Sequence, residues 1–492
     1  MTTAIPTTFE QRSNRIASLL LLTLAFGAFY YLAAGLLYRS GYISHGLLFF
    51  AEKVLLALHG EPPRLVNIGF VYPPLTFLLM LPFVDPLATQ AFVSGTVVAL
   101  VISALDRYHI NDLVRWSAKL YVAFSPLVLF LALESYGELL FCAVLGASIA
   151  YFNRFLRRNY SLHLFAAATL LALTFFIDFR SVVVLLAVVP AMALPFARSS
   201  QAKALSIALT VTVPIAFVAS MWMYVNWIFL GDPLAFLAGG ASYFRTFATL
   251  PQVLAVRGDP RASLLFSARE IARTLPVTLP YFIGLVALRE GGPSESYPYA
   301  RATIYLAPVM LLVLSAFGGI YRPTFAFFGL FVFVFILNLE RMRFAPALAA
   351  GLVLGIVGAF FAPLDSPSAE ERAFAGALAG RPVVSQIAEY ETIARRVSDA
   401  TPAERILLDD AYLFPLVYLV GTPDRFLLPY QYEYPTALSQ PRAFARYVVV
   451  ARMPDDTLHA LYPATERGDL PGFREILRTE RFITFERVGA LN

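Results

Sequence analysis

Apolar runs close to the length of a membrane span recur from residue 16 to residue 363, with short polar breaks between them. A transmembrane helix needs about 20 mostly apolar residues, because the hydrocarbon core of a bilayer is about 30 Å thick. The pattern therefore predicts an all-α, multi-pass transmembrane bundle of about 11–13 spans. The predicted runs cover residues 16–38, 70–84, 87–105, 120–133, 139–152, 163–177, 181–196, 204–230, 274–288, 302–317, 324–339 and 344–363.

The arginines between the runs predict the side of the membrane on which each break lies. Arginines precede the first run and cluster again after the run that ends at residue 152. Because loops rich in arginine and lysine stay in the cytoplasm, the N-terminus is expected inside and the first loop outside. The breaks expected on the same outer side as the first loop, 39–74, are 134–138, 178–180 and 321–322.

One stretch leaves two topologies open. If the runs 70–84 and 87–105 both cross the membrane, the basic segment 107–119 falls outside, against the charge rule. Either one of these runs is re-entrant, or residues 106–133 contain a further crossing. An odd number of spans places the C-terminus outside.

Beyond Pro363 the charge and proline content rise, and short helical and strand patterns alternate. The chain is therefore divided into a transmembrane domain, 1–363, and a C-terminal domain, 364–492. Alternation of this kind predicts a small α/β domain, here on the extracytoplasmic side. The predicted helices cover 368–379, 386–397 and 411–420, and the predicted strands cover 405–409, 425–428, 447–451 and 482–488.

Composition agrees with a membrane protein and argues against several classes of function. Hydrophobic residues make up 58% of the chain and charged residues only 14%, a combination that soluble proteins seldom show. The net charge of +5 suggests basic cytoplasmic loops and no nucleic-acid partner. The one cysteine, Cys142, lies in an apolar run, and the five histidines lack the spacing of a metal site. The first run, 16–38, lacks a small-residue cleavage site and is expected to remain as a span.

Within the first loop, residues 45–59 have the pattern of an amphipathic helix. His45, Glu52 and His59 are spaced by seven and share one narrow stripe, while leucine and phenylalanine fill the other positions. The pattern predicts a helix in the membrane interface that ends before Pro62 and Pro63. Glu52 could act as a general base beside the histidines, or the stripe could simply turn a polar edge to water.

The outer breaks carry further acidic residues. Glu134 and Glu138 are four positions apart and share a face if they lie on one helix. They could bind a substrate or a metal, or form a solvated turn at the membrane edge. Asp178 and Arg180 interrupt an apolar hairpin. They could supply a base and a phosphate anchor, or a structural ion pair that closes the turn.

Two short motifs complete a pattern that is known from a family of enzymes. Tyr72-Pro73-Pro74-Leu75 begins the second apolar run, and Tyr321-Arg322-Pro323 forms a late outer break. With the long first loop, the acidic outer breaks and the C-terminal domain, this layout resembles the GT-C superfamily of membrane glycosyltransferases. The resemblance implies transfer of a sugar from a polyprenyl-phosphate donor to a lipid, glycan or protein acceptor on the outer face of the inner membrane.

The resemblance also implies roles for the candidate residues. The candidates for catalysis are Glu52, Glu134 and Asp178, and those for substrate binding are His45, Tyr72, Glu138, Arg180, Tyr321 and Arg322. Arginine suits a lipid phosphate because its planar fork donates two hydrogen bonds at once. The resemblance makes no cofactor certain, and a divalent cation could hold the phosphate.

Two alternatives stay open. Residues 41–46, Gly-Tyr-Ile-Ser-His-Gly, contain no carboxylate, whereas GT-C enzymes usually have one soon after the first span. The chain could therefore be an inactive GT-C-like subunit that binds or assembles components of a cell-envelope glycan system. A transporter or flippase of lipid-linked glycans ranks last, because the sequence shows no inverted repeat.

Overall fold

The computed structural model divides the chain into two compact units, each described here by itself. The bundle unit comprises Met1–Leu37, Phe70–Thr76 and Leu87–Arg381, and the sheet unit comprises Tyr38–Gly69, Phe77–Pro86 and Pro382–Asn492. The sheet unit thus unites most of the first loop with the C-terminal part of the sequence. The structure describes residues 8–83, 85–108, 110–134, 136–179, 181–197, 199–238, 251–287, 297–319, 327, 336, 344–381, 383 and 387–489.

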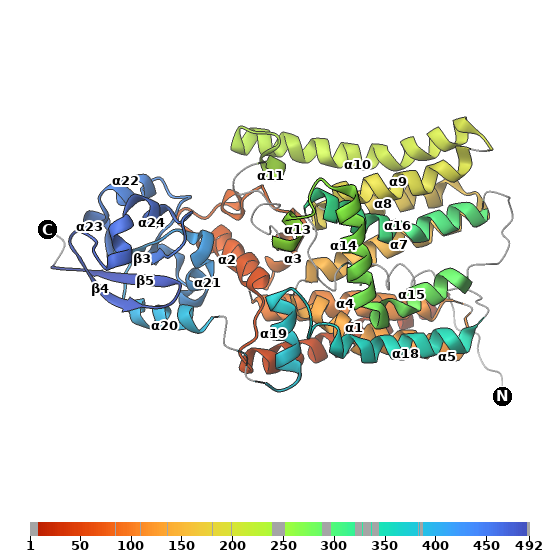
Figure 1. Cartoon of the computed structure of the whole chain (residues 1–492), viewed down its shortest axis with the longest axis horizontal. Helices are drawn as coiled ribbons and strands as arrows, with labels where there is room; N and C mark the ends of the chain where they lie inside the picture. Colours follow the sequence, from red (N-terminus) through yellow and green to blue (C-terminus); the bar gives the residue numbers. More distant parts are fainter. Residues whose placement is uncertain are drawn as a thin grey trace. The chain divides into compact units, whose positions relative to one another are not determined.

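Long apolar helices make up the bundle unit and confirm the predicted all-α multi-pass class (Figure 1). Among the described residues, five helices are long and apolar enough to cross a membrane. The apolar helices are α1 (Thr8–Arg39), α4 (Pro86–Leu105), α5 (Asp112–Phe124), α6 (Pro126–Glu134), α7 (Tyr136–Arg158), α8 (Ser161–Ile177), α9 (Ser181–Ala197), α10 (Gln201–Leu230), α15 (Leu275–Ala287), α16 (Tyr297–Gly318) and α18 (Ala345–Phe361). The connections between them contain α11 (Ala235–Ala238), α13 (Pro251–Leu254) and α14 (Pro260–Arg273), and α19 (Ala369–Leu378) follows α18.

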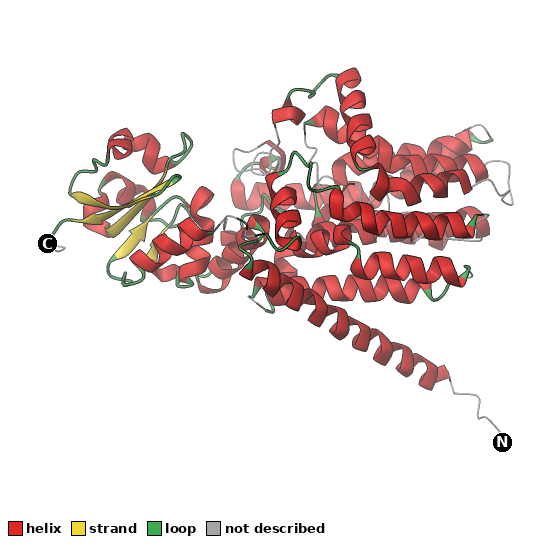
Figure 2. Ribbon diagram, turned by 60° about the horizontal axis from the view of Figure 1, so that its bottom comes forward, coloured by secondary structure: helices red, strands yellow, loops and turns green. Residues whose placement is uncertain are grey.

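Helices of the bundle unit lie side by side, as Figure 2 also shows, with α7 on α8, α8 and α9 on α10, and α15 on α18. Close backbone approach holds α1 against α4: a Cβ built on Gly95 would lie 2.6 Å from the amide nitrogen of Gly27. Small residues permit such contacts between membrane helices. Large apolar side chains remain exposed on the outer helices, for example Leu21 at 69% and Phe217 at 67%, as expected for surfaces that face lipid.

The helix after the first loop is relevant to the two topologies that the sequence left open. The run at 70–84 forms only α3 (Pro74–Met80), which has 7 residues. At about 1.5 Å per residue this helix is about 10 Å long, which is too short for a core of about 30 Å. Helix α3 is therefore too short to cross a bilayer by itself, whereas α4 is long and apolar enough to do so. The predicted run at 324–339 lies outside the described residues, apart from 327 and 336.

The sheet unit contains a five-stranded mixed sheet in the order β2-β1-β3-β5-β4. Strand β1 is parallel to β2 and β3, with Ile406 opposite Phe426 and Tyr447, whereas β5 is antiparallel to β3 and β4. The strands are β1 (Arg405–Leu407), β2 (Phe426–Leu427), β3 (Ala445–Ala451), β4 (Phe473–Arg478) and β5 (Phe482–Arg487). The helices are α2 (His45–His59), α20 (Ala388–Val397), α21 (Asp410–Val420), α22 (Tyr434–Ser439), α23 (Pro441–Phe444) and α24 (Thr457–Leu461), with 3-10 turns at Leu65–Ile68, Pro423–Arg425 and Pro463–Arg467.

Alternation along the strands explains how helices cover both faces of this sheet. Val449 points to the face that α20 and α21 cover, and Val448 and Val450 point to the face that α22 and α24 cover. Leu48 and Leu56 of α2 join the first of these cores. The predicted helix at 45–59 is confirmed with the same bounds, and its apolar side chains complete a soluble-type core together with the C-terminal sequence.

Candidate functional site

Asp178 lies in the turn that joins two helices of the bundle unit. Helix α8 ends at Ile177, the amide of Asp178 donates to the carbonyl of Thr174 at 2.9 Å, and the amide of Ser181 donates to the carbonyl of Asp178 at 3.0 Å. The Asp178 residue is only 3% exposed. A buried carboxylate is costly unless a partner or a substrate compensates for the lost hydration. The tight turn therefore holds a carboxylate where water reaches it poorly.

Glu134 and Glu138 lie on either side of the junction between α6 and α7. They are 7% and 6% exposed. Glu138 is in the first turn of α7, where the helix dipole favours a negative charge. Between them, the hydroxyl of Tyr136 donates to the carbonyl of Thr76 at 2.5 Å. This bond connects the acidic break directly to the segment 70–76.

The segment 70–76 brings the acidic break and the Asp178 turn to the same region of the bundle unit. Asn226 donates from Nδ2 to the carbonyl of Phe70 at 3.1 Å. The ring of Trp222 lies 6.0 Å from that of Phe70 and 6.2 Å from that of Phe179, centroid to centroid. Tyr72, in the middle of this segment, is 7% exposed. The structure thus gathers around one short segment the elements that carry four of the candidate residues, Tyr72, Glu134, Glu138 and Asp178.

Glu52 occupies a different setting, in the sheet unit. It is fully buried, and its Oε2 lies 3.3 Å from Nζ of Lys53. The same Nζ lies 2.5 Å from Oδ2 of Asp410, at the start of α21. Burial, opposed by Lys53 and reinforced by Asp410, raises the pKa of Glu52 to about 8. The expectation of a polar edge turned to water is therefore wrong for Glu52, because α2 directs this carboxylate into the protein.

The two histidines of the same stripe differ from Glu52 and from each other. His45 is half-buried, and its ring lies 6.4 Å from the rings of both Tyr390 and Phe414. His59, at the other end of α2, is exposed. The seven-residue spacing places the three side chains on one stripe of α2. Their exposure nevertheless differs, because Glu52 is buried, His45 is half-buried and His59 is exposed.

Two buried acids of the sheet unit, Asp409 and Asp456, are not among the candidate residues that the sequence suggests. Asp409 accepts hydrogen bonds at Oδ2 from the amide of Thr457 at 3.2 Å and from its hydroxyl at 2.5 Å. Asp456 caps α24 by accepting from the amide of His459 at 2.8 Å. Burial, with Asp409 adding to it, raises the pKa of Asp456 to about 7. An Asp before a short helix is the signal that could have found this cap.

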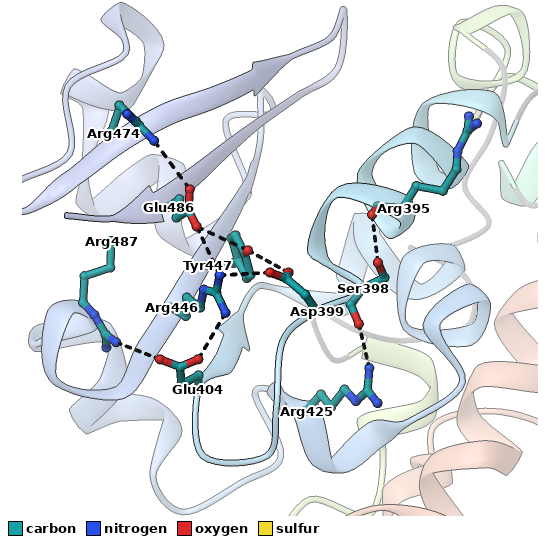
Figure 3. A network of polar contacts seen from close by, with 10 residues as sticks. All are labelled: Arg395, Ser398, Asp399, Glu404, Arg425, Arg446, Tyr447, Arg474, Glu486 and Arg487. Carbon is teal, nitrogen blue, oxygen red and sulfur yellow. Dashed lines mark hydrogen bonds and ion pairs between the residues drawn. The ribbon is translucent and has the colours of Figure 1, made fainter. Parts of the chain in front are cut away.

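Charged side chains on the rim of the sheet form a separate network (Figure 3). Arg446 pairs with Asp399 at 2.9 Å, Glu404 at 3.2 Å and Glu486 at 3.4 Å, and the hydroxyl of Tyr447 donates to Asp399 at 2.8 Å. Because each acid already has a basic or hydroxyl partner, this network is suited to holding the loop before β1 on the sheet.

Two further buried acids of the bundle unit, Glu270 and Glu371, were not among the sequence candidates. Arg273, at the end of α14, lies 2.9 Å from Glu270 and donates from Nη1 to the carbonyl of Ala362 at 2.9 Å. Glu371 of α19 is buried near this pair, and burial raises its pKa to about 8. These contacts tie the long loop after α10 to the end of α18. The sequence does not predict this proximity, because Glu270 and Glu371 are far apart along the chain.

Three candidate residues, Arg180, Tyr321 and Arg322, lie outside the described residues. Within the described part of the chain, no group of three or more His, Cys, Asp or Glu side chains could hold a metal ion. The arrangement therefore offers buried carboxylates for proton transfer.

Known proteins resemble the chain in structure, whereas no protein-family model and no curated protein matches its sequence. The crystal structure of ArnT from Cupriavidus metallidurans bound to undecaprenyl phosphate aligns with a TM-score of 0.59 at 12% identity, covering 96% of this chain and 98% of that one. The apo structure of the same protein gives 0.58 at 13% identity, covering 95% and 98%. Mycobacterial arabinofuranosyltransferase AftD gives only 0.37 at 14% identity and covers 95% of this chain and 40% of AftD. The chain therefore shares the fold of these ArnT structures, and the GT-C-like fold that its sequence layout predicts is confirmed.

Proposed function

We propose that the protein is a membrane glycosyltransferase that moves a sugar from a polyprenyl-phosphate donor to a lipid, glycan or protein acceptor. The observation that carries this proposal is the end-to-end likeness to an ArnT structure that holds undecaprenyl phosphate, with 96% of this chain and 98% of that chain aligned. Enzymes that share only the fold can differ in chemistry, so the residues of the site carry the rest of the argument. We place the protein in the inner membrane, with the reaction and the sheet unit on the outer side.

The reaction needs two kinds of group. An acceptor hydroxyl attacks the anomeric carbon, the bond between that carbon and the phosphate oxygen breaks, and the polyprenyl phosphate leaves with its electron pair. A base must take the hydroxyl proton, and a positive charge must stabilise the departing phosphate. Carboxylates can serve as the base, and arginines can hold the phosphate with two parallel hydrogen bonds.

Asp178 and Glu134 are the bases that the bundle unit supports best. Both are buried, at 3% and 7% exposure, and both lie on elements joined by the segment that carries Tyr72. Glu52 has a pKa of about 8, which suits a base near neutral pH. Its burial and its pairing with Lys53, however, favour a role in holding α2. We assign the phosphate to Arg180 and Arg322, and acceptor or sugar contacts to His45, Tyr72, Glu138 and Tyr321.

Turnover by the full-length protein tests this proposal. Proteoliposomes would be given synthetic polyprenyl-phosphate sugars, hexosyl and pentosyl, together with an extract of envelope lipids and glycans. Mass spectrometry would then follow free polyprenyl phosphate and the glycosylated acceptor. The proposal predicts that both products appear together and in equal amounts. Donor that binds without being consumed, for every sugar and acceptor fraction supplied, would contradict it.

A second candidate function rests on a specific observation. Residues 39–51 contain no carboxylate, and Glu52, the first one in the loop, is fully buried beside Lys53. A protein that retained the fold and lost the base would bind the lipid carrier and help to assemble an envelope-glycan complex. Saturable binding of undecaprenyl phosphate without any turnover would favour this candidate over the enzyme.

A further inference from the structure

Helix α14 of the bundle unit presents an unusual outward face. Its start is fixed by Asp259, whose Oδ1 accepts from the amides of Arg261 at 2.8 Å and Ala262 at 3.1 Å, and by Pro260 in the first turn. The cap uses the carboxylate of Asp259 for backbone hydrogen bonds. Such a helix has a defined start, so the face on which each side chain lies is defined as well.

In α14 the serines and the glutamate are buried and the leucines are exposed, which is the opposite of what a water-soluble helix shows. Ser263, Ser267 and Glu270 point into the protein and are 0%, 1% and 4% exposed. Leu264 and Leu265 point outward and are 57% and 63% exposed. Water penalises exposed leucines, whereas lipid does not. The outward face therefore fits an apolar surrounding.

The charged side chains of α14 also differ between its two faces. The acid Glu270 points inward and pairs with Arg273 at 2.9 Å. Arg261 and Arg269 are exposed, as is Arg257 just before the helix, and no ion pair joins these three arginines to an acid within the described residues. The outward face thus combines leucines with arginines that have no acidic partner among the described residues.

Two hydrogen bonds place α14 along the ends of two apolar helices. The amide of Gly258, just before α14, donates to the carbonyl of Phe317 at the end of α16 at 2.9 Å. Arg273, the last residue of α14, donates to the carbonyl of Ala362 just after α18 at 2.9 Å. Figure 1 agrees, since α14 runs across α16 and α18 and not along them. If α16 and α18 cross a bilayer, a helix that joins their ends in this way runs along the bilayer surface.

We propose that α14 is a lipid-binding surface, with Leu264 and Leu265 among the acyl chains and Arg261 and Arg269 on the phosphates of anionic phospholipid headgroups. Guanidinium groups fit phosphate oxygens with two parallel hydrogen bonds. Interfacial helices with basic polar positions bind anionic bilayers more tightly than neutral ones. The proposed occupant is an anionic phospholipid of the bilayer, and the proposal does not depend on catalysis.

Site-specific quenching tests the proposal on the full-length protein in nanodiscs. A polarity-sensitive fluorophore would be attached to Leu265→Cys, since the native Cys142 is buried. Brominated phosphatidylglycerol and brominated phosphatidylcholine would be compared as quenchers, with iodide as the aqueous quencher. A label on Phe217→Cys of α10, which is 67% exposed, is the matched lipid-facing control.

The proposal predicts that the label at 265 is quenched by lipid and poorly by iodide, and that phosphatidylglycerol quenches it more than phosphatidylcholine does. The double variant Arg261→Gln, Arg269→Gln should bring the two lipids toward equality, by about fivefold for each arginine. The control label should show no preference, and Arg395→Gln in the sheet unit should change nothing.

Three results would overturn the proposal. The first is quenching of the label at 265 by iodide and not by lipid. The second is equal quenching by the two lipids when Arg261 and Arg269 are both present. The third is loss of the phosphatidylglycerol signal when undecaprenyl phosphate is added in equimolar amount, because the surface would then belong to the carrier.

Discussion

Helices α2 and α14 have similar amphipathic sequences but differ in the exposure of their leucines. Both mix leucines with a few charged residues. In α2 the leucines are buried, and Leu48 and Leu56 are 0% exposed. In α14 the leucines are exposed, and Leu265 is 63% exposed. The first helix completes a core with the C-terminal sequence, and the second leaves its apolar side open.

The difference teaches what amphipathic spacing can decide in a membrane protein. Periodicity separates an apolar stripe from a polar one, but it does not say whether protein or lipid covers the apolar stripe. In α2 the partner is α21, more than 350 positions away along the chain, as the pair Lys53–Asp410 shows with a separation of 357. In α14 the polar residues find protein partners nearby, so the leucines are left outside.

The largest expected effect comes from shortening one leucine on each helix. Leu56→Ala should lower the free energy of unfolding by about 3–4 kcal/mol, because it leaves a cavity in a packed core. Leu265→Ala should change it by less than about 0.5 kcal/mol in detergent, because no packed neighbours are lost. Thermal unfolding of the purified variants measures both. Equal losses for the two variants would break the comparison.

Removing the cation between the two acids of the sheet unit should cost somewhat less. Lys53→Met leaves Glu52 and Asp410 without the charge that lies 3.3 Å and 2.5 Å from them. Loss of one partner from a mostly buried cluster should destabilise the protein by about 2–3 kcal/mol. The matched control is Lys203→Met, since Lys203 is exposed on α10. If both lysine variants unfold at the same temperature, the cluster does not hold α2.

Protonation of Glu52 predicts a pH dependence that Glu52→Gln removes. Burial raises the pKa of this carboxyl from 4.5 to about 8, so between these pH values the folded chain keeps a proton that the unfolded chain has lost. The free energy of unfolding should therefore fall as pH rises through this window, by at most about 1.4 kcal/mol per pH unit. Melting temperatures from pH 5.5 to 8.5 should fall less in Glu52→Gln than in the wild type. Parallel curves for the two proteins would refute the assignment.

The smallest effect concerns the arginines of α14. Arg261→Gln with Arg269→Gln should shift stability in detergent by less than about 0.5 kcal/mol, because both side chains are exposed and unpaired within the described residues. In nanodiscs the wild type should gain thermal stability from phosphatidylglycerol, and the double variant should lose most of that gain. A thermal scan with and without this lipid makes the comparison; a double variant that keeps the full gain would contradict the lipid-binding role.

Much of the fold could be predicted because local signals agree with it. The helix at 45–59 begins at His45 after the Ser44 cap, whose Oγ accepts from the amide of Leu47 at 3.1 Å, and it ends at His59, shortly before the Pro62-Pro63 pair. The strand at 447–451 follows from a run of valines. Strand β4 was missed because its sequence, Phe-Arg-Glu-Ile-Leu-Arg, carries charges that suit the edge of a sheet.

The candidate site was harder to predict, because its members come together only through long-range packing. The sequence selected Glu134, Glu138, Asp178 and Tyr72 one by one, and the structure connects their elements through Tyr136, Trp222 and Asn226. No spacing rule links Tyr136 to Thr76 across 60 positions. The same holds for Lys53 and Asp410, and for Arg273 and Ala362 across 89 positions. The chemistry of the side chains was enough to select candidate residues, but only the tertiary structure shows which of them lie close together.

The rate of donor cleavage in carboxamide variants tests the central claim, that buried carboxylates of this fold carry sugar transfer from a polyprenyl phosphate. Glu134→Gln, Asp178→Asn and Glu52→Gln would be compared with wild type on a donor that the wild type turns over. Asp112→Asn serves as the control, since its side chain is 81% exposed. The account predicts that at least one of the first two variants loses about 100-fold or more of the rate while its melting temperature is retained. Full activity in all three carboxylate variants would contradict it.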